Sequence, residues 1–83
     1  MSLHDDLRDH LCHLLFGEVV PESELGDDDD LFQVGLDSMG ILKVVTWIEK
    51  RTGRPLEDRA IRSDRFRTLR SLVALAEERA ASR

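Results

Sequence analysis

The sequence predicts a small all-α fold, and two observations lead to this prediction. Apolar residues recur at helical spacing in three separate stretches. No stretch alternates apolar and polar residues over a convincing length, so no strand is expected. Glycine and proline divide the helical stretches from one another. The chain of 83 residues is long enough for one modest core, and we expect residues 1–83 to form a single domain.

The first helix is expected over residues 3–16. Ser2 and Asp5 have the spacing of a helix-start capping pair, and Gly17 ends the helical pattern. A connection of about 20 residues follows, and a connection of this length should be packed down or functional in a compact domain. The residues expected to make its packing contacts are Leu25, Leu31, Phe32, Val34 and Leu36.

The same connection contains four consecutive aspartates at residues 27–30. Carboxylate oxygens are suitable calcium ligands, but the run lacks the alternating acidic order, central glycine and terminal glutamate of a calcium-binding loop. We therefore expect these aspartates to be solvated or to display charge.

The second helix is expected from Ser38 to about residue 51, because the carboxylate of Asp37 is suited to accept from the free N–H groups at a helix start. Its apolar face, with Leu42 at the edge, consists of Ile41, Val44, Val45 and Ile48. Its other face consists of Met39, Lys43, Thr46, Trp47 and Lys50.

The remaining sequence predicts one short and one long helix. Residues 52–55 end the second helix, and any helix between residues 57 and 66 is short. Thr68 can cap a last helix that runs to near the C-terminus. The expected architecture is a small four-helix bundle with a long first loop and a short third helix.

Charge is unevenly distributed along the chain. The net charge is −5, yet residues 1–37 hold eleven acidic groups against one basic group, and residues 38–83 hold six acidic against eleven basic groups. The charge therefore changes sign at Ser38. Such a division suggests that partners recognise one face electrostatically.

Several classes of protein are disfavoured. No run approaches the roughly 20 apolar residues of a membrane-spanning helix, so no membrane partner is expected. The N-terminus lacks the features of a secretory signal or transit peptide, and we expect a cytoplasmic protein. Cys12 is the only cysteine, which excludes an internal disulfide. Neither nucleotide-binding glycine spacing nor a hydrolase serine elbow occurs.

Two further constellations are weighed as alternatives. Asp6, His10 and His13 can share one side of the first helix, but three ligands on one exposed helix are a weak pattern, and we expect no metal site. A helical protein- or nucleic-acid-interaction module is the competing class. Its arginines alternate with acidic residues in an acidic protein, so no nucleic-acid partner is expected. These arginines are Arg59, Arg62, Arg65, Arg67 and Arg70.

Ser38 occupies a position suited to a phosphate. A serine directly after an N-cap lies where a helix projects unpaired N–H groups and the positive end of its dipole. A phosphodiester on Ser38 would be stabilised by this field. The alternative is that Ser38 is only a residue with good helix-start propensity.

The segment around Ser38 resembles a known family signature. Residues 29–39, Asp-Asp-Leu-Phe-Gln-Val-Gly-Leu-Asp-Ser-Met, are similar to the phosphopantetheine attachment site of acyl and peptidyl carrier proteins. The order and lengths of the expected helices are similar too, so the resemblance covers nearly the whole chain. It implies a carrier protein rather than an enzyme.

The resemblance also implies what the site residues and partners do. Ser38 would receive a 4'-phosphopantetheine arm from coenzyme A through a magnesium-dependent phosphopantetheinyl transferase, and Asp37 would help to present the site. The terminal thiol of the arm would hold an acyl or aminoacyl group as a thioester. Further partners would be a loading enzyme and downstream synthase or transferase enzymes, visited by a monomeric carrier.

Departures from the family pattern reduce the number of biosynthetic pathways that this carrier would be expected to serve. Gly40 and Lys43 occupy positions that are often acidic in fatty-acid carriers, and Lys50 adds positive charge, which disfavours dedicated fatty-acid synthesis. The Gly-Gly-His/Asp-Ser form common in peptidyl carriers is absent. The motif therefore favours a polyketide-type or other secondary-metabolite pathway, with a discrete peptidyl or aminoacyl carrier as the alternative.

The outer face of the second helix is a candidate docking surface. Met39, Lys43 and Trp47 are spaced by four residues and can form one exposed apolar and basic stripe. Partner docking would explain an exposed tryptophan. The alternative is that Trp47 packs against the loop around Leu25 or Phe32.

Overall fold

The computed structural model describes residues 2–81, and every regular element in that range is helical. The elements are α1 Leu3–Phe16, α2 Leu31–Val34, α3 Ser38–Thr52, α4 Asp58–Ile61, the 3-10 turn η1 Asp64–Phe66, and α5 Leu69–Ala81. The all-α prediction is confirmed. The three long helices α1, α3 and α5 begin where the sequence predicted, and α2 is an addition inside the expected long loop.

The ends of the long helices follow the expected capping chemistry. The Ser2 hydroxyl accepts a hydrogen bond from the Asp5 N–H at 3.1 Å and starts α1. Gly17 ends α1 with φ at 79°, and Gly53 ends α3 with φ at 71°. Both angles lie in the left-handed region, where a glycine has no Cβ penalty.

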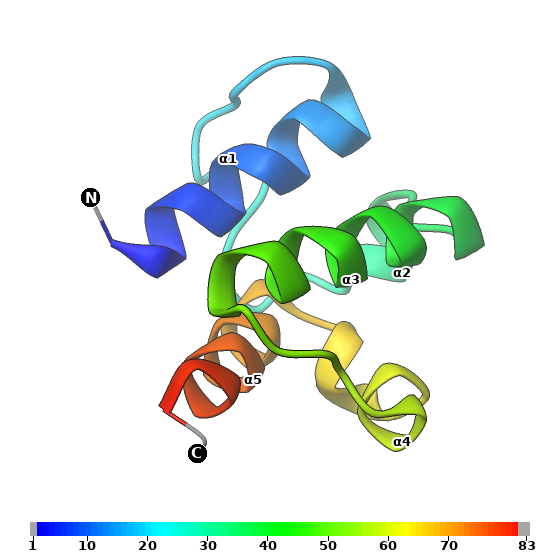
Figure 1. Ribbon diagram of the computed structural model, residues 1–83. Coiled ribbons are helices and arrows are strands. Elements are labelled where there is room, and N and C mark those ends of the chain that lie inside the picture. The colour runs from blue at the N-terminus through cyan, green and yellow to red at the C-terminus, as the bar shows by residue number, and fades with distance from the viewer. Residues whose placement is uncertain (1, 82–83) are drawn as a thin grey trace.

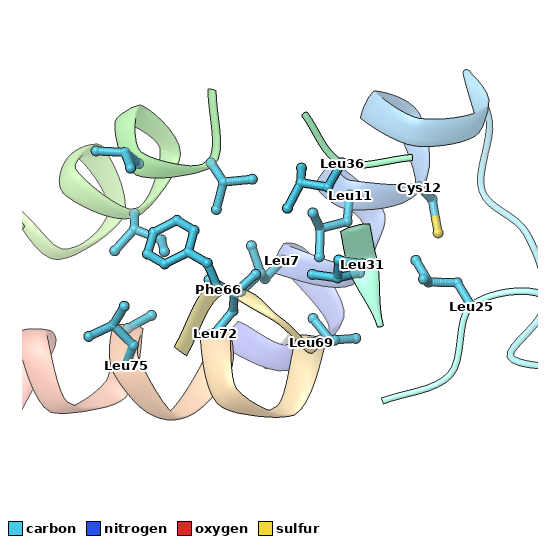
Figure 2. Packing of buried hydrophobic residues seen from close by; sticks show 14 of the residues in the cluster. Leu7, Leu11, Cys12, Leu25, Leu31, Leu36, Phe66, Leu69, Leu72 and Leu75 are labelled. Atoms are coloured by element: carbon cyan, nitrogen blue, oxygen red, sulfur yellow. The ribbon is translucent and has the colours of Figure 1, made fainter. Parts of the chain in front are cut away.

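The core lies between α1, α3 and α5, which all contact one another. In the view of Figure 1, α1 lies on one side of α3, and α4 and α5 lie on the other. Phe66 from η1 reaches the centre of this core and is completely buried (Figure 2). Cys12 on α1 is also completely buried. The other fully buried residues are Leu7, Leu11, Leu25, Leu31, Val44, Ile48, Leu69, Leu72 and Ala76.

The first connection packs against the core through most of the residues that were expected to do so. Leu25, Leu31 and Leu36 are buried, and Val34 is half-buried. Phe32 is 44% exposed, so its expected core contact is wrong. It lies in α2 next to the buried Leu31, and successive side chains of a helix point about 100° apart, so Phe32 points away from the core that Leu31 faces.

A buried arginine that was not singled out by sequence holds this connection in place. Arg8 on α1 is only 9% exposed, and its guanidinium donates to the Val20 carbonyl at 2.7 Å and to the Leu25 carbonyl at 3.2 Å. Carbonyl groups in a buried loop need such donors because they lack a helical partner. Arg8 thus fastens the connection to the first helix.

The four aspartates lie at the surface, as expected, and Asp28 and Asp30 also form ion pairs that the sequence did not predict. Asp28 accepts two hydrogen bonds from Arg70, at 2.7 and 3.2 Å. Asp30 accepts from Arg67 at 3.2 Å and from the Phe32 N–H at 3.0 Å, which starts α2. The run therefore joins the first connection to the start of α5.

Candidate functional site

Ser38 is the first residue of α3 and is exposed to solvent. The preceding residue, Asp37, has extended backbone angles, and its carboxylate accepts a hydrogen bond from the Gly40 N–H at 2.9 Å. This is the N-cap geometry that the sequence predicted. The cap fixes the direction in which the chain enters α3 and leaves the Ser38 hydroxyl at the surface.

A tight contact beneath Ser38 supports this geometry. A Cβ on Gly40 would lie 2.7 Å from Leu36 Cδ1 and 3.4 Å from Asp37 Oδ1. Leu36 is only 5% exposed, and its N–H donates to the Leu31 carbonyl at 2.8 Å. Gly40 therefore lets the segment before Ser38 pack directly against α3. In the sequence, Gly40 stood out only because fatty-acid carriers often have an acidic residue at this position. A close approach between the Leu36 side chain and the backbone of Gly40 produces no recognisable sequence pattern.

Three other serines of the described range have their hydroxyl groups engaged in local structure. Ser2 caps α1, Ser63 caps η1, and Ser71 donates to the Arg65 carbonyl at 2.7 Å. Ser23 is exposed in a turn of the first connection. Ser38 differs from all of these because it begins a helix of 15 residues.

The start of α3 provides a favourable field for a phosphate. Its first turn contains no acidic residue, so no carboxylate within the helix opposes an anion there. Asp37 occupies the N–H of Gly40, which leaves the N–H groups of Ser38 and Met39 without an intrahelical partner. Free N–H groups and the positive end of the dipole both favour a phosphate ester at this end.

A family comparison covers the site and most of the core. The family described as "phosphopantetheine attachment site" matches residues 5–76. This chain belongs to that family. Comparisons with curated proteins and with solved structures give no match. The family match confirms that the chain is a carrier domain with a helical bundle, as the resemblance implied.

Membership of the family establishes the cofactor. Carrier domains of this family bind 4'-phosphopantetheine covalently, and they work with a phosphopantetheinyl transferase and with synthase enzymes. They are generally carriers rather than catalysts. The arm supplies a thiol that holds cargo as a thioester, and the exposed serine at a helix start with free N–H groups fits a phosphate ester.

The outer face of α3 in this carrier domain is exposed along its length except at Trp47. Met39 is 65% exposed and Leu42 is 63% exposed. Lys43 is also exposed. Trp47 is half-buried, and the ring contact that the structure gives it is with His10 on α1 rather than with the first connection.

His10 and Trp47 join α1 to α3. Their rings are stacked, with centroids 5.6 Å apart and an interplanar angle of 22°. The Arg51 guanidinium lies 5.7 Å from the Trp47 ring centroid and also donates to the Asp6 carboxylate at 2.6 Å. Burial lowers the pKa of His10 below its ordinary value of 6.5, so this imidazole is neutral at neutral pH.

Two of the three candidate metal ligands on α1 are engaged in these contacts instead. Asp6 pairs with Arg51, and His10 stacks on Trp47. Within residues 2–81, no group of three or more His, Cys, Asp or Glu side chains is arranged to hold a metal ion.

The arginines of the competing interaction-module hypothesis are mostly paired within the carrier domain. Arg65 pairs with Glu78, Arg67 with Asp30 and Asp64, and Arg70 with Asp28. Arg59 lies 3.7 Å from Glu57.

No helix within residues 2–81 is long and apolar enough to cross a membrane.

Proposed function

We propose that this carrier domain is an acyl carrier protein that holds biosynthetic intermediates as thioesters on a phosphopantetheine arm at Ser38. The observation that carries the proposal is the exposed Ser38 hydroxyl at the start of α3, inside the segment that matches the family. We take residues 1–83 as one carrier domain. The pathway that we propose is polyketide-type or another secondary-metabolite pathway.

The attachment step is a phosphoryl transfer. The Ser38 oxygen attacks the β-phosphorus of coenzyme A, a new O–P bond forms, and the P–O bond to adenosine 3',5'-bisphosphate breaks. The hydroxyl proton would pass to a base of the transferase, and magnesium bound to the transferase would stabilise the charge on the leaving group. The role of Ser38 is to present its oxygen, and the cap formed by Asp37 holds the helix start in position for the transferase.

The attachment is tested by intact-protein mass. The chain is incubated with coenzyme A, magnesium and a broad-range phosphopantetheinyl transferase. The wild type and Ser23→Ala should gain the mass of one arm, whereas Ser38→Ala should gain none. Ser23 is the matched control because it is also exposed. Equal gain by Ser38→Ala, or no gain by the folded wild type, contradicts the proposal.

Whether Asp37 helps to present Ser38 to the transferase is tested with the variant Asp37→Asn. Asparagine retains the cap but removes the charge. Slower arm transfer with unchanged unfolding free energy would show that the transferase reads the carboxylate itself. Unchanged transfer would limit Asp37 to capping.

The pathway is tested by the groups that the arm accepts. The run Gly35, Leu36 and Asp37 before the serine, in place of the Gly-Gly-His/Asp form of many peptidyl carriers, supports an acyl rather than an aminoacyl cargo. Lys43 and Lys50 on α3 disfavour dedicated fatty-acid synthesis. A purified malonyl-type acyltransferase should load the holo protein. Loading by an amino-acid-activating enzyme alone would instead support the peptidyl-carrier alternative.

We propose that Met39, Lys43 and Trp47 take part in partner docking, with Met39 and Lys43 as the outermost contacts. The exposure of Met39 beside the attachment serine supports this role. Lys43→Glu should slow loading by the cognate enzyme without changing the fold, whereas the reversal Lys50→Glu, one turn beyond Trp47, should have a smaller effect. If Lys43→Glu is loaded at the wild-type rate, Lys43 does not take part in docking.

We also propose that the carrier acts as a cytoplasmic monomer. A carrier must release each partner after transfer, and a monomer leaves the α3 surface free for the next one. A molecular mass twice that of the chain, measured by light scattering at assay concentration, would contradict this.

A further inference from the structure

Two large apolar side chains lie at the surface where α1 meets the first connection. Phe16, the last residue of α1, is 38% exposed, and Val19 in the connection is 53% exposed. Neither side chain belongs to the hydrophobic core or to the residues packed against it. An exposed apolar pair of this kind is a candidate for contact with another protein.

Three exposed carboxylates follow in the same stretch, on Glu18, Glu22 and Glu24. Within the part of the chain that the structure describes, none of the three forms an ion pair, whereas aspartates of the same connection pair with arginines near α5. The negative charge of these glutamates is therefore not compensated by residues 2–81.

Buried contacts hold this stretch in a fixed shape. The Arg8 guanidinium donates to the carbonyls of Val20 and Leu25, and both of these side chains are buried. Between them, the Glu24 N–H donates to the Pro21 carbonyl at 2.9 Å. A surface that is ordered before it binds loses little entropy on association.

The stretch begins at the end of the bundle that presents Ser38. Leu14 and Leu15 of α1 line a hollow of about 230 Å³ together with Asp37, and Phe16 follows them directly. In the view of Figure 1, the end of α1 and the start of α3 lie on the same side of the molecule. A partner that reaches Ser38 is therefore close to Phe16 as well.

The partner that modifies Ser38 needs cationic groups at this end. Coenzyme A has a pyrophosphate and a 3'-phosphate, and proteins hold such groups with arginine and lysine. The exposed charges of α3 do not match a cationic surface, because they belong to Lys43 and Lys50. Glu49 is half-buried and accepts from the Leu56 N–H at 2.9 Å. The carboxylates of the first connection do match it.

We propose that Phe16, Glu18, Val19, Glu22 and Glu24 form a docking surface for the phosphopantetheinyl transferase. The apolar pair contacts the transferase directly, and the glutamates face the cationic rim of its coenzyme A site. The proposal rests on the proposed attachment at Ser38. This surface is distinct from the outer face of α3, so the enzyme that attaches the arm and the enzymes that load it recognise different elements of the carrier.

The kinetics of arm transfer test the charged part of the surface. The chain is incubated at several concentrations with coenzyme A, magnesium and the broad-range transferase, and the gain of the arm is followed by intact mass. Glu18→Lys should raise the KM for the carrier by about fivefold, because a charge at the rim of an interface acts on association. Its kcat should not change, because Ser38 and the Asp37 cap remain intact.

Glu77→Lys is the matched control. Glu77 on α5 is also exposed, forms no ion pair within residues 2–81, and changes the net charge equally when it is replaced by lysine. Its KM should change by less than about twofold, because salt screens charges that lie far from the interface.

Salt separates the charged contacts from the apolar ones. When the salt concentration rises from about 0.05 M to about 0.5 M, the KM of the wild type should approach that of Glu18→Lys. Val19→Ser removes apolar surface without changing the charge, so its KM should exceed that of the wild type at both concentrations. An effect of Glu18→Lys that persists unchanged at high salt contradicts the cationic partner surface.

The outcomes distinguish this inference from the function on which it rests. A folded wild-type chain that gains no arm contradicts attachment at Ser38. A wild-type KM for Glu18→Lys, or an equal rise for Glu77→Lys, contradicts only the docking surface. If Glu18→Lys gains the arm normally but is then loaded slowly by the acyltransferase, the surface belongs to the loading enzyme, and the assignment to the transferase is overturned.

Discussion

Gly40 in α3 and Leu36 in the segment before it are so close that a methyl group on Gly40 would lie 2.7 Å from Leu36 Cδ1. This contact packs the segment before Ser38 against α3, the helix that Ser38 begins. Leu36 is buried and has little room to move. The geometry at Ser38 therefore depends on the absence of a side chain one turn into α3.

Gly40→Ala should lower the unfolding free energy. Overpacking costs about 1–3 kcal/mol, and the better helix propensity of alanine returns about 1 kcal/mol. The expected net loss is about 1 kcal/mol, measured by urea unfolding. In a Leu36→Ala background the clash is removed, so Gly40→Ala should there become neutral or stabilising. Equal effects in both backgrounds would show that Leu36 is not the obstacle.

Asp37→Ala should lower the unfolding free energy by about 1 kcal/mol, because it removes the hydrogen bond to the Gly40 N–H. Glu57→Ala is the matched control. Glu57 is also an acidic N-cap residue, but its side chain makes no cap hydrogen bond, and its removal should change stability by less than about 0.5 kcal/mol. A similar loss for both variants would contradict a specific capping role.

Arg8→Met should destabilise the fold by about 2–3 kcal/mol, because two buried carbonyl groups lose their charged donor. Arg79→Met is the control, since Arg79 also donates to a carbonyl, that of Pro55, but at an exposed site. Its loss should cost about 1 kcal/mol or less. Limited proteolysis should cut Arg8→Met first between residues 17 and 30. Unchanged cleavage there would contradict the anchoring role.

His4 and His10 should affect stability in opposite directions as pH changes. A hydrogen bond to Asp27, followed by one to Asp5, raises the pKa of His4 above 6.5. Its stabilising contribution is complete below 6.5 and is lost as pH rises through the raised pKa. Burial lowers the pKa of His10, so protonation of the unfolded chain destabilises the fold as pH falls below 6.5.

Urea unfolding of His4→Gln and His10→Gln across the pH range around 6.5 measures these contributions. The advantage of the wild type over His4→Gln should shrink as pH rises, whereas its advantage over His10→Gln should shrink as pH falls. Slopes of the same sign would show that one of the two contacts does not persist in solution.

The long helices could be predicted because their signals are local. The Ser2 and Asp37 caps, the terminating glycines and the apolar spacing all lie within or beside the helix that they define. The helix α2 has four residues and too few positions to show a period. The partners of the aspartates lie far away in the chain, as Asp28 and Arg70 show with a separation of 42 positions. Their pairing follows from the fold, which no local pattern contains.

The candidate site also contains some features that the sequence could predict and others that depend on the fold. Ser38 and Asp37 are placed by adjacent residues, and the sequence located both correctly at the helix start. The environment of Trp47 depends on the approach of α1 to α3, and the sequence contained no sign that His10 would stack on it. The contact between these two helices at Trp47 could therefore be found only from the structure.

The complete burial of Cys12 in the core has a practical consequence for chemical labelling. A thiol shielded from solvent reacts slowly with alkylating reagents. In the folded holo form, the arm would then carry the one readily alkylated sulfur of this chain. A bifunctional reagent could join that sulfur to a cysteine in the active site of a partner enzyme without replacing any residue of the carrier, and would trap the pair in the act of transfer.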